Sequence, residues 1–323
     1  MSDHDRALEL ITIGETMLRL MAPAGQSLEA VSHLDIAVAG AESNVAVALS
    51  RLGHPSGWVS SLPDNALGRL VANRIREHGV DTSRVRWVDS GARLGIYYWE
   101  DAAPPRPGRV IYDRADSAFA RTRPDEINWD YVGSARRLHL TGITPALSPS
   151  CLEIVVRALR VARSRRRTIS FDVNYRATLW PASEAAATLA QLVQSVDLLF
   201  SSSRDAERLF GAGGVPEEQA AWLAQRFDCP LVVVTAGAEG AAAWDGRPHR
   251  VEALRAAQVD PIGRGDAFVA GFLHGIDLAD TAEALRYATT VAALKQTFRG
   301  DLLWATTAEV DALLKSDPAG IER

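Results

Sequence analysis

The feature that most restricts how this chain can fold is an alternation of short apolar runs with longer segments of helical periodicity. Short apolar runs bounded by turn residues predict buried strands, and apolar residues at helical spacing predict helices. One such helix carries Val45, Ala48, Leu49 and Leu52 on a single face and is closed by Gly53. The order strand, helix, strand implies a parallel sheet covered by helices on both faces. The runs expected to form its strands are residues 8–14, 58–62, 137–143, 168–173, 197–200 and 230–234.

This alternation stops between residues 84 and 113, where three strand-like runs follow one another with no helix between them. The runs cover residues 84–88, 94–99 and 109–113. The link at residues 101–108 contains three prolines, which is typical of a loop. We therefore expect this region to form an antiparallel flap outside the core sheet.

Two residues of the flap, Tyr112 and Arg114, share one face because side chains alternate along a strand. An arginine beside a tyrosine suits a polar ligand with a carboxylate, since guanidinium holds carboxylate in a bidentate fork. An ordinary solvated strand with an aromatic packing partner shows the same pattern. The residues alone leave both interpretations open.

A glycine-containing turn near the C-terminal end leads into a helical segment that begins near Asp266. The first amides of a helix have no intrahelical partner, and together with the helix dipole they bind anions. The amides of Gly263, Arg264 and Gly265 therefore predict an anion site, and Asp266 can take the proton of a hydroxyl that attacks phosphorus. An aspartate that only caps the helix gives the same local pattern.

Composition excludes several classes of protein. The net charge of −5 and the pI near 5.8 argue against a nucleic-acid surface, and no apolar run approaches the length of a membrane span. The acidic start, residues 1–6, does not resemble a signal peptide, so we expect a cytoplasmic protein. Cys151 and Cys229 are expected to be small buried hydrophobes. The two lysines, Lys295 and Lys315, follow no glycine-rich loop, which removes a Walker A motif.

Two widely separated motifs carry the most specific signal. One runs over residues 40–44 and is followed by Leu52-Gly53, and the other covers residues 260–268. With both in this order, the chain resembles the ribokinase-like (PfkB-type) carbohydrate kinases from end to end. Residues 140–148, residues 172–176 and the pair Gly300-Asp301 narrow the resemblance to the 2-keto-3-deoxygluconate kinases.

The resemblance implies an α/β fold: a three-layer, doubly wound, mostly parallel sheet with a small β-sheet lid. It implies a single domain over residues 1–323, with the lid formed by about residues 15–38 and 91–115. It also implies an ATP-dependent kinase that uses Mg²⁺. The apolar and aromatic residues of the flap, rather than the resemblance, suggest a homo-oligomer that pairs through the lid.

On the substrate side, the resemblance implies that Gly40 and Asn44 contact sugar hydroxyls. Tyr97, Tyr112 and Arg114 resemble lid residues that cover the substrate. The same likeness makes Ile143 a substrate contact and lets Arg176 reach a carboxylate or phosphate. Asp301 resembles a residue that closes the site from the C-terminal side.

On the nucleotide side, the resemblance makes Asp266 the base and the amides of residues 263–265 the anion hole. The positions that resemble nucleotide contacts are Asn174, Ser202, Thr235, Gly237 and Gly240. Ser202 also pairs with Asp205, and together they resemble the polar and acidic pair that helps to hold hydrated Mg²⁺. Capping of a helix by Ser202 is compatible with that role.

The chain departs from the family pattern at three places. Arg264 stands where the family usually has alanine, so its side chain either adds positive charge near the phosphates or crowds ATP. Thr235 and Ala236 replace a more basic pair, and Ala39 replaces a usual glycine. These changes bear on nucleotide affinity more than on fold.

The sequence therefore predicts ATP-dependent phosphorylation of a sugar acid, with 2-keto-3-deoxygluconate converted to its 6-phosphate as the first choice. The same chemistry on fructose or on another deoxy-keto acid is the nearest alternative. A sugar-binding protein with impaired ATP use, blocked by Arg264, is a different class. A NAD-dependent dehydrogenase is disfavoured because no G-x-G-x-x-G follows the first strand.

Overall fold

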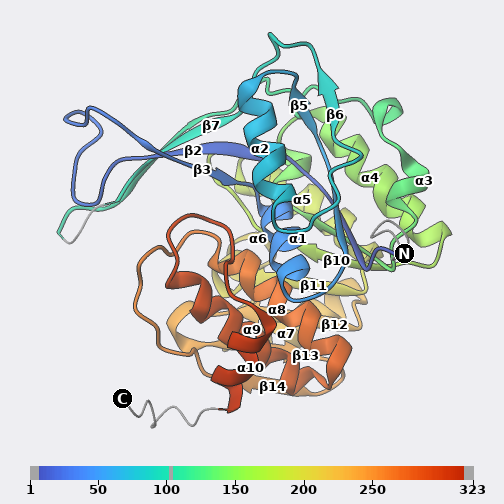
Figure 1. The fold of residues 1–323 in the computed structure, drawn as a ribbon. Coiled ribbons are helices and arrows are strands. Elements are labelled where there is room, and N and C mark those ends of the chain that lie inside the picture. The colour runs from blue at the N-terminus through green and yellow to red at the C-terminus, as the bar shows by residue number, and fades with distance from the viewer. Residues whose placement is uncertain (1–6, 102–104, 316–323) are drawn as a thin grey trace.

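The computed structural model describes residues 7–101 and 105–315, and Figure 1 shows the course of the chain. The predicted absence of a signal peptide concerns residues 1–6, which lie outside the described residues, as do residues 102–104 of the proline-containing link. Among the described residues, no helix is long and apolar enough to cross a membrane.

The larger sheet has eight strands within the described part of the chain. Every pairing from β4 to β12 is parallel, as the alternation of strands and helices predicted, and β13 and β14 add an antiparallel edge. In spatial order the strands are β14 (Pro248–Val251), β13 (Ala241–Trp244), β12 (Leu231–Thr235), β11 (Leu198–Ser202), β10 (Thr168–Asp172), β9 (Arg137–Thr141), β1 (Leu10–Ile13) and β4 (Ser56–Val59).

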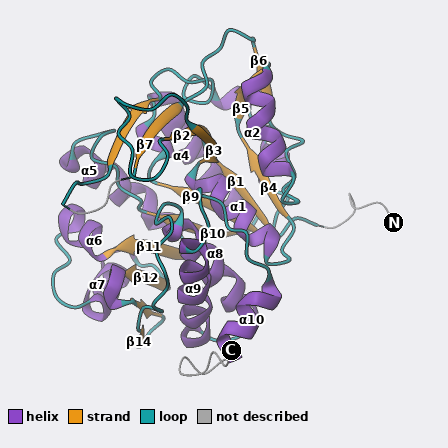
Figure 2. Ribbon diagram, turned by 60° about the vertical axis from the view of Figure 1, so that its left-hand side comes forward, coloured by secondary structure: helices purple, strands orange, loops and turns teal. Residues whose placement is uncertain are grey.

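Helices cover both faces of this sheet, which gives the predicted three layers (Figure 2). The strands alternate their side chains between two separate apolar cores, so that Leu199 faces one and Phe200 the other. The helices of the first face are α3 (Trp129–Val132), α4 (Pro149–Ser164), α5 (Ala182–Leu192), α6 (Ser203–Phe210) and α7 (Pro216–Phe227). The helices of the second face are α1 (Ala41–Arg51), α8 (Arg264–Leu278), α9 (Thr281–Gln296) and α10 (Thr307–Lys315).

A second, four-stranded sheet extends away from the three layers and is prominent at the upper left of Figure 1. We call it the second sheet. Its strands, in spatial order, are β3 (Asp35–Ala39), β2 (Met17–Met21), β7 (Ile96–Glu100) and β8 (Arg109–Asp113). The expected antiparallel flap is correct for β7 and β8, but β2 and β7 pair in parallel, so the second sheet is mixed.

Two predictions about this region were wrong. Residues 84–88 do not belong to the flap, because β6 (Arg86–Val88) pairs in parallel with β5 (Ser61–Pro63) in a separate two-stranded sheet beside α2 (Ala66–Arg76). The run 58–62 does not form one strand, since it is divided after Val59 between β4 and β5.

The segment immediately before α1 belongs to the second sheet. Residues 36–39 are apolar and precede a helix without a break in composition, yet they pair with β2 as strand β3. Gly40 has an extended backbone (φ −165°, ψ 128°) and ends the strand immediately before α1. A long-range strand partner therefore decides a segment whose local sequence favours continuation of the helix.

The position of the site follows from this topology. In parallel sheets, ligands bind beyond the carboxyl ends of the strands, because the loops that leave those ends meet along one edge. Gly14, Gly142, Asn174 and Ser202 all follow or end such strands here. The free thiols of Cys151 and Cys229 are buried, as predicted.

Candidate active site

The two motifs that are far apart in sequence meet in the structure. Asn44 lies in the first turn of α1 and Asp266 in the first turn of α8, and the Asn44 Nδ2 donates to Asp266 Oδ2 at 2.6 Å. Both side chains are buried. Gly40 precedes α1 and Gly263 precedes α8, so each polar group projects from a helix start that follows a glycine.

The turn before α8 leaves several amides open. Gly263 has a left-handed backbone (φ 81°), and a Cβ there would lie 2.1 Å from the Asp301 carbonyl oxygen, so only glycine fits. Within residues 7–101 and 105–315, no protein group accepts from the amides of Gly263, Gly265 or Asp266. The Arg264 amide makes a long contact of 3.4 Å to the Pro261 carbonyl. This helix start is therefore free to receive an anion.

Burial raises the pKa of Asp266 to about 6, while the hydrogen bond from Asn44 opposes that rise. A carboxylate with this pKa is ionised at neutral pH and is a much better proton acceptor than an ordinary aspartate. The side chain lies beside open amides, so a hydroxyl between them and a phosphoryl group would find its proton acceptor in place.

A cavity of about 630 Å³ opens beside the same helix start. We call it the nucleotide cavity, because five predicted nucleotide-side residues line it: Thr235, Gly237, Gly240, Arg264 and Gly265. Gly240 has φ 93°, and a Cβ there would lie 2.0 Å from the Val251 carbonyl oxygen, so the loop closes on the neighbouring strand. The size is typical of a cofactor site.

Arginines supply the positive charge of the nucleotide cavity. Arg255 and Arg264 line it and are exposed, and neither has an ion-pair partner among the described residues. Arg250 also lines it, but its guanidinium is held by Glu217 at 3.0 Å. The absence of a Walker A lysine is thus matched by free guanidinium groups around the cavity.

A cluster of polar residues lies at the carboxyl ends of β10 and β11. Burial raises the pKa of Asp172 to about 7 and also raises the pKa of Asp205, and the Arg176 charge opposes both shifts. Arg176 is exposed and, in the described part of the chain, unpaired. Asn174 has φ 40° and donates its amide to Asp172 at 3.1 Å.

Ser202 caps α6, because its hydroxyl accepts from the Asp205 amide at 3.0 Å, which is the alternative that the sequence left open. Asp172 and Asp205 supply carboxylate oxygens, the donors that suit hydrated Mg²⁺. Burial is the largest cause of both raised pKa values, and a cation bound nearby would lower them. The donor set therefore fits a magnesium ion held through water.

On the side of Asp266 away from the nucleotide cavity, the predicted substrate-side residues are already paired with other side chains. The Tyr97 hydroxyl lies 3.2 Å from both oxygens of Asp301, and its ring lies 5.6 Å from the ring of Tyr112. Arg114 lies 6.0 Å from the Tyr112 ring, which confirms their shared face. Its Nε donates to Glu15 at 2.9 Å, and its Nη2 contacts the same oxygen.

Sequence reasoning missed the acidic residues of this side. Glu15 is buried, and its second oxygen, Oε1, has no partner in the described structure. Burial raises the pKa of Glu42 to about 7, although Thr141 and Thr144 both donate to it, at 2.8 and 2.6 Å. Both glutamates follow strand ends of the large or second sheet, which is the signal that could have found them.

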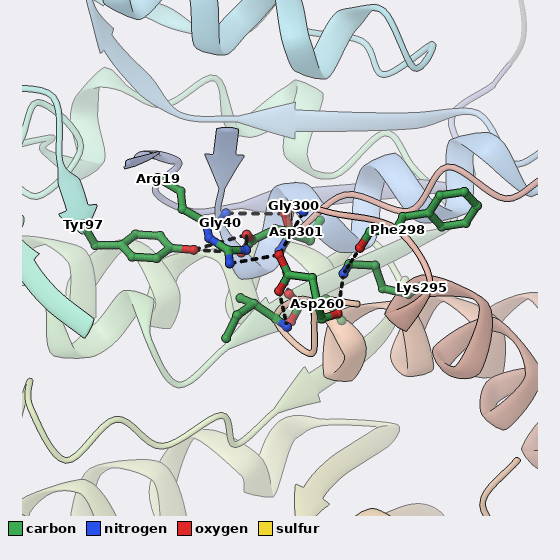
Figure 3. A network of polar contacts seen from close by, with 11 residues as sticks. Arg19, Gly40, Tyr97, Asp260, Lys295, Phe298, Gly300 and Asp301 are labelled. Atoms are coloured by element: carbon green, nitrogen blue, oxygen red, sulfur yellow. Dashed lines mark hydrogen bonds and ion pairs between the residues drawn. The ribbon is translucent and has the colours of Figure 1, made fainter. Parts of the chain in front are cut away.

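Sequence reasoning also missed a buried network of charges, shown in Figure 3. Arg19 contacts Asp301 at 2.7 Å and Asp260 at 2.9 Å. The Lys295 ammonium donates to the carbonyls of Asp260 and Phe298, at 3.2 and 3.4 Å. An arginine in the middle of an otherwise apolar strand, Met17–Met21, is the sequence signal for this network.

Open amides beside a buried carboxylate, next to a cavity with free arginines, form an arrangement that suits phosphoryl transfer at the carboxyl edge of a parallel sheet. The sequence profile of the pfkB family carbohydrate kinases matches residues 7–303, and the chain belongs to this family.

Three known proteins illustrate the likeness. The chain is 44% identical, over 98% of its length and 99% of the other, to a 2-dehydro-3-deoxygalactonokinase of Haloferax volcanii. The crystal structure of a 2-dehydro-3-deoxygluconokinase from Thermotoga maritima matches with a TM-score of 0.89 at 30% identity, over 96% of this chain and all of the other. A putative ribokinase II from E. coli, solved with ATP and Mg²⁺, shares the fold with a TM-score of 0.86 at 22% identity, over 95% of this chain and 99% of the other.

Proposed function

We propose that this carbohydrate kinase phosphorylates a 2-dehydro-3-deoxy sugar acid on its 6-hydroxyl with ATP, and that 2-dehydro-3-deoxygluconate and its galactonate epimer are the first candidates. The observation that supports this most directly is the pairing of Asp266 with Asn44 beside three open amides. The names of the relatives from H. volcanii and T. maritima support the substrate class. The second sugar named by these relatives differs from the first at one carbon, so both belong in the same assay.

In the proposed reaction, Asp266 accepts the proton of the 6-hydroxyl as its oxygen attacks the γ-phosphorus of ATP. Asn44 holds the carboxylate by donating to Oδ2, which leaves Oδ1 for the substrate. The amides of Gly263, Gly265 and Asp266 donate to the oxygens of the transferring phosphoryl group, where negative charge is concentrated. The bond from phosphorus to the bridging oxygen breaks, and ADP leaves.

ATP is proposed to occupy the nucleotide cavity, with its phosphates toward Arg264 and Gly265. Phe268, Ala292 and Ala293 line the same cavity and offer apolar surface to the adenine ring of ATP. Asp205 and Asp172 would hold Mg²⁺ through water, and the ion would neutralise charge on the phosphates. In this placement, the free arginines neutralise the phosphates directly, and Asp172 and Asp205 do so through the ion that they would hold.

The second sheet is proposed to act as the lid over the sugar, within about residues 15–38 and 91–115. One face carries Arg19, Tyr97 and Tyr112 at neighbouring register positions, and this face looks toward Asp301. Arg114 is proposed to bind the carboxylate of the sugar acid, since one oxygen of Glu15 holds only two of its three nitrogens. A closed lid would exclude water and favour transfer over hydrolysis of ATP.

The outer face of the second sheet is proposed to pair with a second copy of the chain. Ile36, Leu20, Tyr98 and Ile111 occupy one cross-strand row of that face, and Ile36 and Ile111 are 53% and 47% exposed. An exposed apolar row of this kind is typical of an interaction surface. Sedimentation should show an oligomer for the wild type and a smaller species for I111E. The same sedimentation coefficient for both proteins would argue against this pairing. We place the enzyme in the cytoplasm, where ATP is available.

The test of the proposed function is a substrate panel assayed with Mg-ATP. It should contain 2-dehydro-3-deoxygluconate, its galactonate epimer, fructose, and the 3-deoxy ketose that lacks the carboxylate. We expect the two sugar acids to give the highest kcat/KM, with ADP and the 6-phosphate formed in equal amounts. Preference for fructose would reject the substrate class, and binding of a sugar acid without any turnover would reject the kinase.

A further inference from the structure

The buried network of Arg19, Asp260, Asp301 and Lys295 is shown in Figure 3. It adjoins the turn that carries the open amides, because Asp260 begins that turn and the Asp301 carbonyl packs against Gly263. Arg19 is fully buried, and Asp260 and Asp301 are 4% and 5% exposed. Burial opposes the charge of Arg19, but Asp301, Tyr97 and Asp260 together raise its pKa above the ordinary value. The guanidinium therefore stays charged and bridges the two carboxylates.

Both aspartates contact backbone that shapes the turn, Asp260 through its carboxylate and Asp301 through its main-chain carbonyl. Asp260 Oδ1 accepts from the Ile262 amide at 3.1 Å, and its Oδ2 accepts from the Gly300 amide at 2.9 Å. The Asp301 carbonyl packs against Gly263 so closely that no Cβ fits between them. The guanidinium of Arg19 thus clamps residues 260–263 to residues 300–301, and this contact orients the amides of the turn.

Arg19 reaches this turn from a different part of the molecule. It lies on β2, in the middle of the second sheet, and Tyr97 is its register partner on β7. Arg19 Nη1 and the Tyr97 hydroxyl both contact Asp301. Side chains from two neighbouring strands of the proposed lid therefore contact a single carboxylate beside the amides proposed to bind phosphate.

We infer that Arg19, which lies on the second sheet, is a positioning residue that sets the geometry of the amides proposed to bind phosphate. Through Arg19, the second sheet and the turn before α8 keep a fixed position relative to each other. In this inference, Arg19 contacts neither substrate. It acts through Asp260 and Asp301, and a guanidinium is required because two carboxylates must be held at a fixed separation. Arg19 donates a hydrogen bond to Asp301 through Nη1 and forms an ion pair with Asp260 through Nη2. A lysine keeps the charge but has one nitrogen in place of these two.

The alternative is that Arg19 only stabilises the fold, and a matched variant separates the two. Arg137 is also an almost buried arginine in a pair, with Asp277 at 3.0 Å, but it begins β9 at the opposite edge of the sheet from the amides. R19K and R137K each keep the charge and lose the guanidinium fork. A purely structural role predicts that both variants lose stability and that both keep the kcat of the wild type.

The experiment measures kcat and KM with the sugar acid, the Kd for Mg-ATP by calorimetry, and the unfolding temperature of the wild type, R19K and R137K. We expect kcat of R19K to fall at least tenfold and its Kd for Mg-ATP to rise at least threefold, with the KM for the sugar acid within about threefold of the wild type. R137K should change each of these less than twofold. Wild-type kcat and Kd in R19K, or equal losses in R137K, would overturn the inference.

The catalytic part of this test rests on the proposed function, whereas the nucleotide affinity does not. If the wild type phosphorylates none of the sugars, the proposed function fails, and the Kd for Mg-ATP in R19K against R137K still decides the role of Arg19. If R19K does not fold, R19Q combined with D301N removes one charge of each sign and takes its place. An unchanged Mg-ATP affinity in that double variant would likewise overturn the inference.

Discussion

The two sides of Asp266 differ in how their polar groups are satisfied. On the side proposed for the nucleotide, which we call the nucleotide side, Arg255 and Arg264 are exposed and unpaired among the described residues, and they line an open cavity. On the side proposed for the sugar, which we call the sugar side, Arg114 is held by Glu15 and Tyr97 by Asp301, and these side chains are largely buried. One side offers free charge to a ligand of high charge, and the other offers side chains whose positions are fixed before a ligand arrives. Affinity on the first side should depend on charge, and on the second side on geometry.

The largest expected effect lies at the boundary between the two sides. D266N should fold normally and lose about 10³-fold or more in kcat, because the amide cannot accept the proton. The raised pKa of Asp266 also means that the folded state binds the proton more tightly than the unfolded state, so the charged carboxylate costs stability above about pH 6. D266N should therefore unfold at an equal or higher temperature at pH 8.

The control for this variant is D277N, at the far end of the same helix, which should keep kcat within about twofold of the wild type. Thermal unfolding by circular dichroism and steady-state rates would measure both properties. Turnover of D266N near the wild-type rate would remove Asp266 from the role of base.

On the sugar side, R114A should lower kcat/KM for the sugar acid by about 10- to 100-fold, the usual range for a charge-assisted hydrogen bond. The loss should be several-fold smaller for the matching ketose without the carboxylate. Comparing two substrates in the same variant cancels any general effect of leaving Glu15 unpaired. Equal losses for both substrates would show that Arg114 does not bind a carboxylate, and would weaken the contrast between the sides.

The pH dependence of kcat/KM should report on the ionisation of Asp266. Because burial raises the pKa of Asp266 to about 6, kcat/KM should fall about tenfold per pH unit below that value as the base becomes protonated. It should become level only above about pH 8, once Asp172, whose pKa burial raises to about 7, is ionised as well. Rates from pH 5 to 9, with circular dichroism to confirm that the protein stays folded, would test this. A flat profile across pH 6 would contradict the assignment.

The smallest effect is expected on the nucleotide side. R264A should raise the Kd for Mg-ATP only about threefold, because a single exposed charge is screened by solvent and salt. The affinity for the sugar acid should not change. Calorimetric titration would measure both constants at low and at physiological ionic strength. Tighter binding of Mg-ATP by R264A would show that the Arg264 side chain crowds the nucleotide. It would favour the alternative that this chain is a sugar-binding member of the family with impaired ATP use.

The parts of the fold with a strong local pattern could be predicted from the sequence. Apolar runs such as the one that forms β12 have no polar face, so they predict buried parallel strands. The strands β2 and β3 could not be placed in the same way, because their pairing depends on each other and on β7, which is distant in the chain. The separate pairing of β5 and β6 was lost for the same reason.

The site shows the same division. Asp266 and Asn44 stand at helix starts after glycine, so their exposure to a ligand could be expected from local sequence. The contacts of Arg114 with Glu15 and of Arg19 with Asp260 could not, because they join residues of opposite charge from distant segments. A chain rich in arginine and acidic residues offers many such pairs, and only the packing selects among them.

The fully buried Lys295 has a practical consequence, because the chain has only one other lysine, Lys315. Lys315 ends α10 and is exposed, so amine-reactive reagents should modify it at once. Lys295 would react only when the core around α9 opens. The rate at which a second lysine acquires label would thus time that opening without any engineered probe, and bound ligands should slow it.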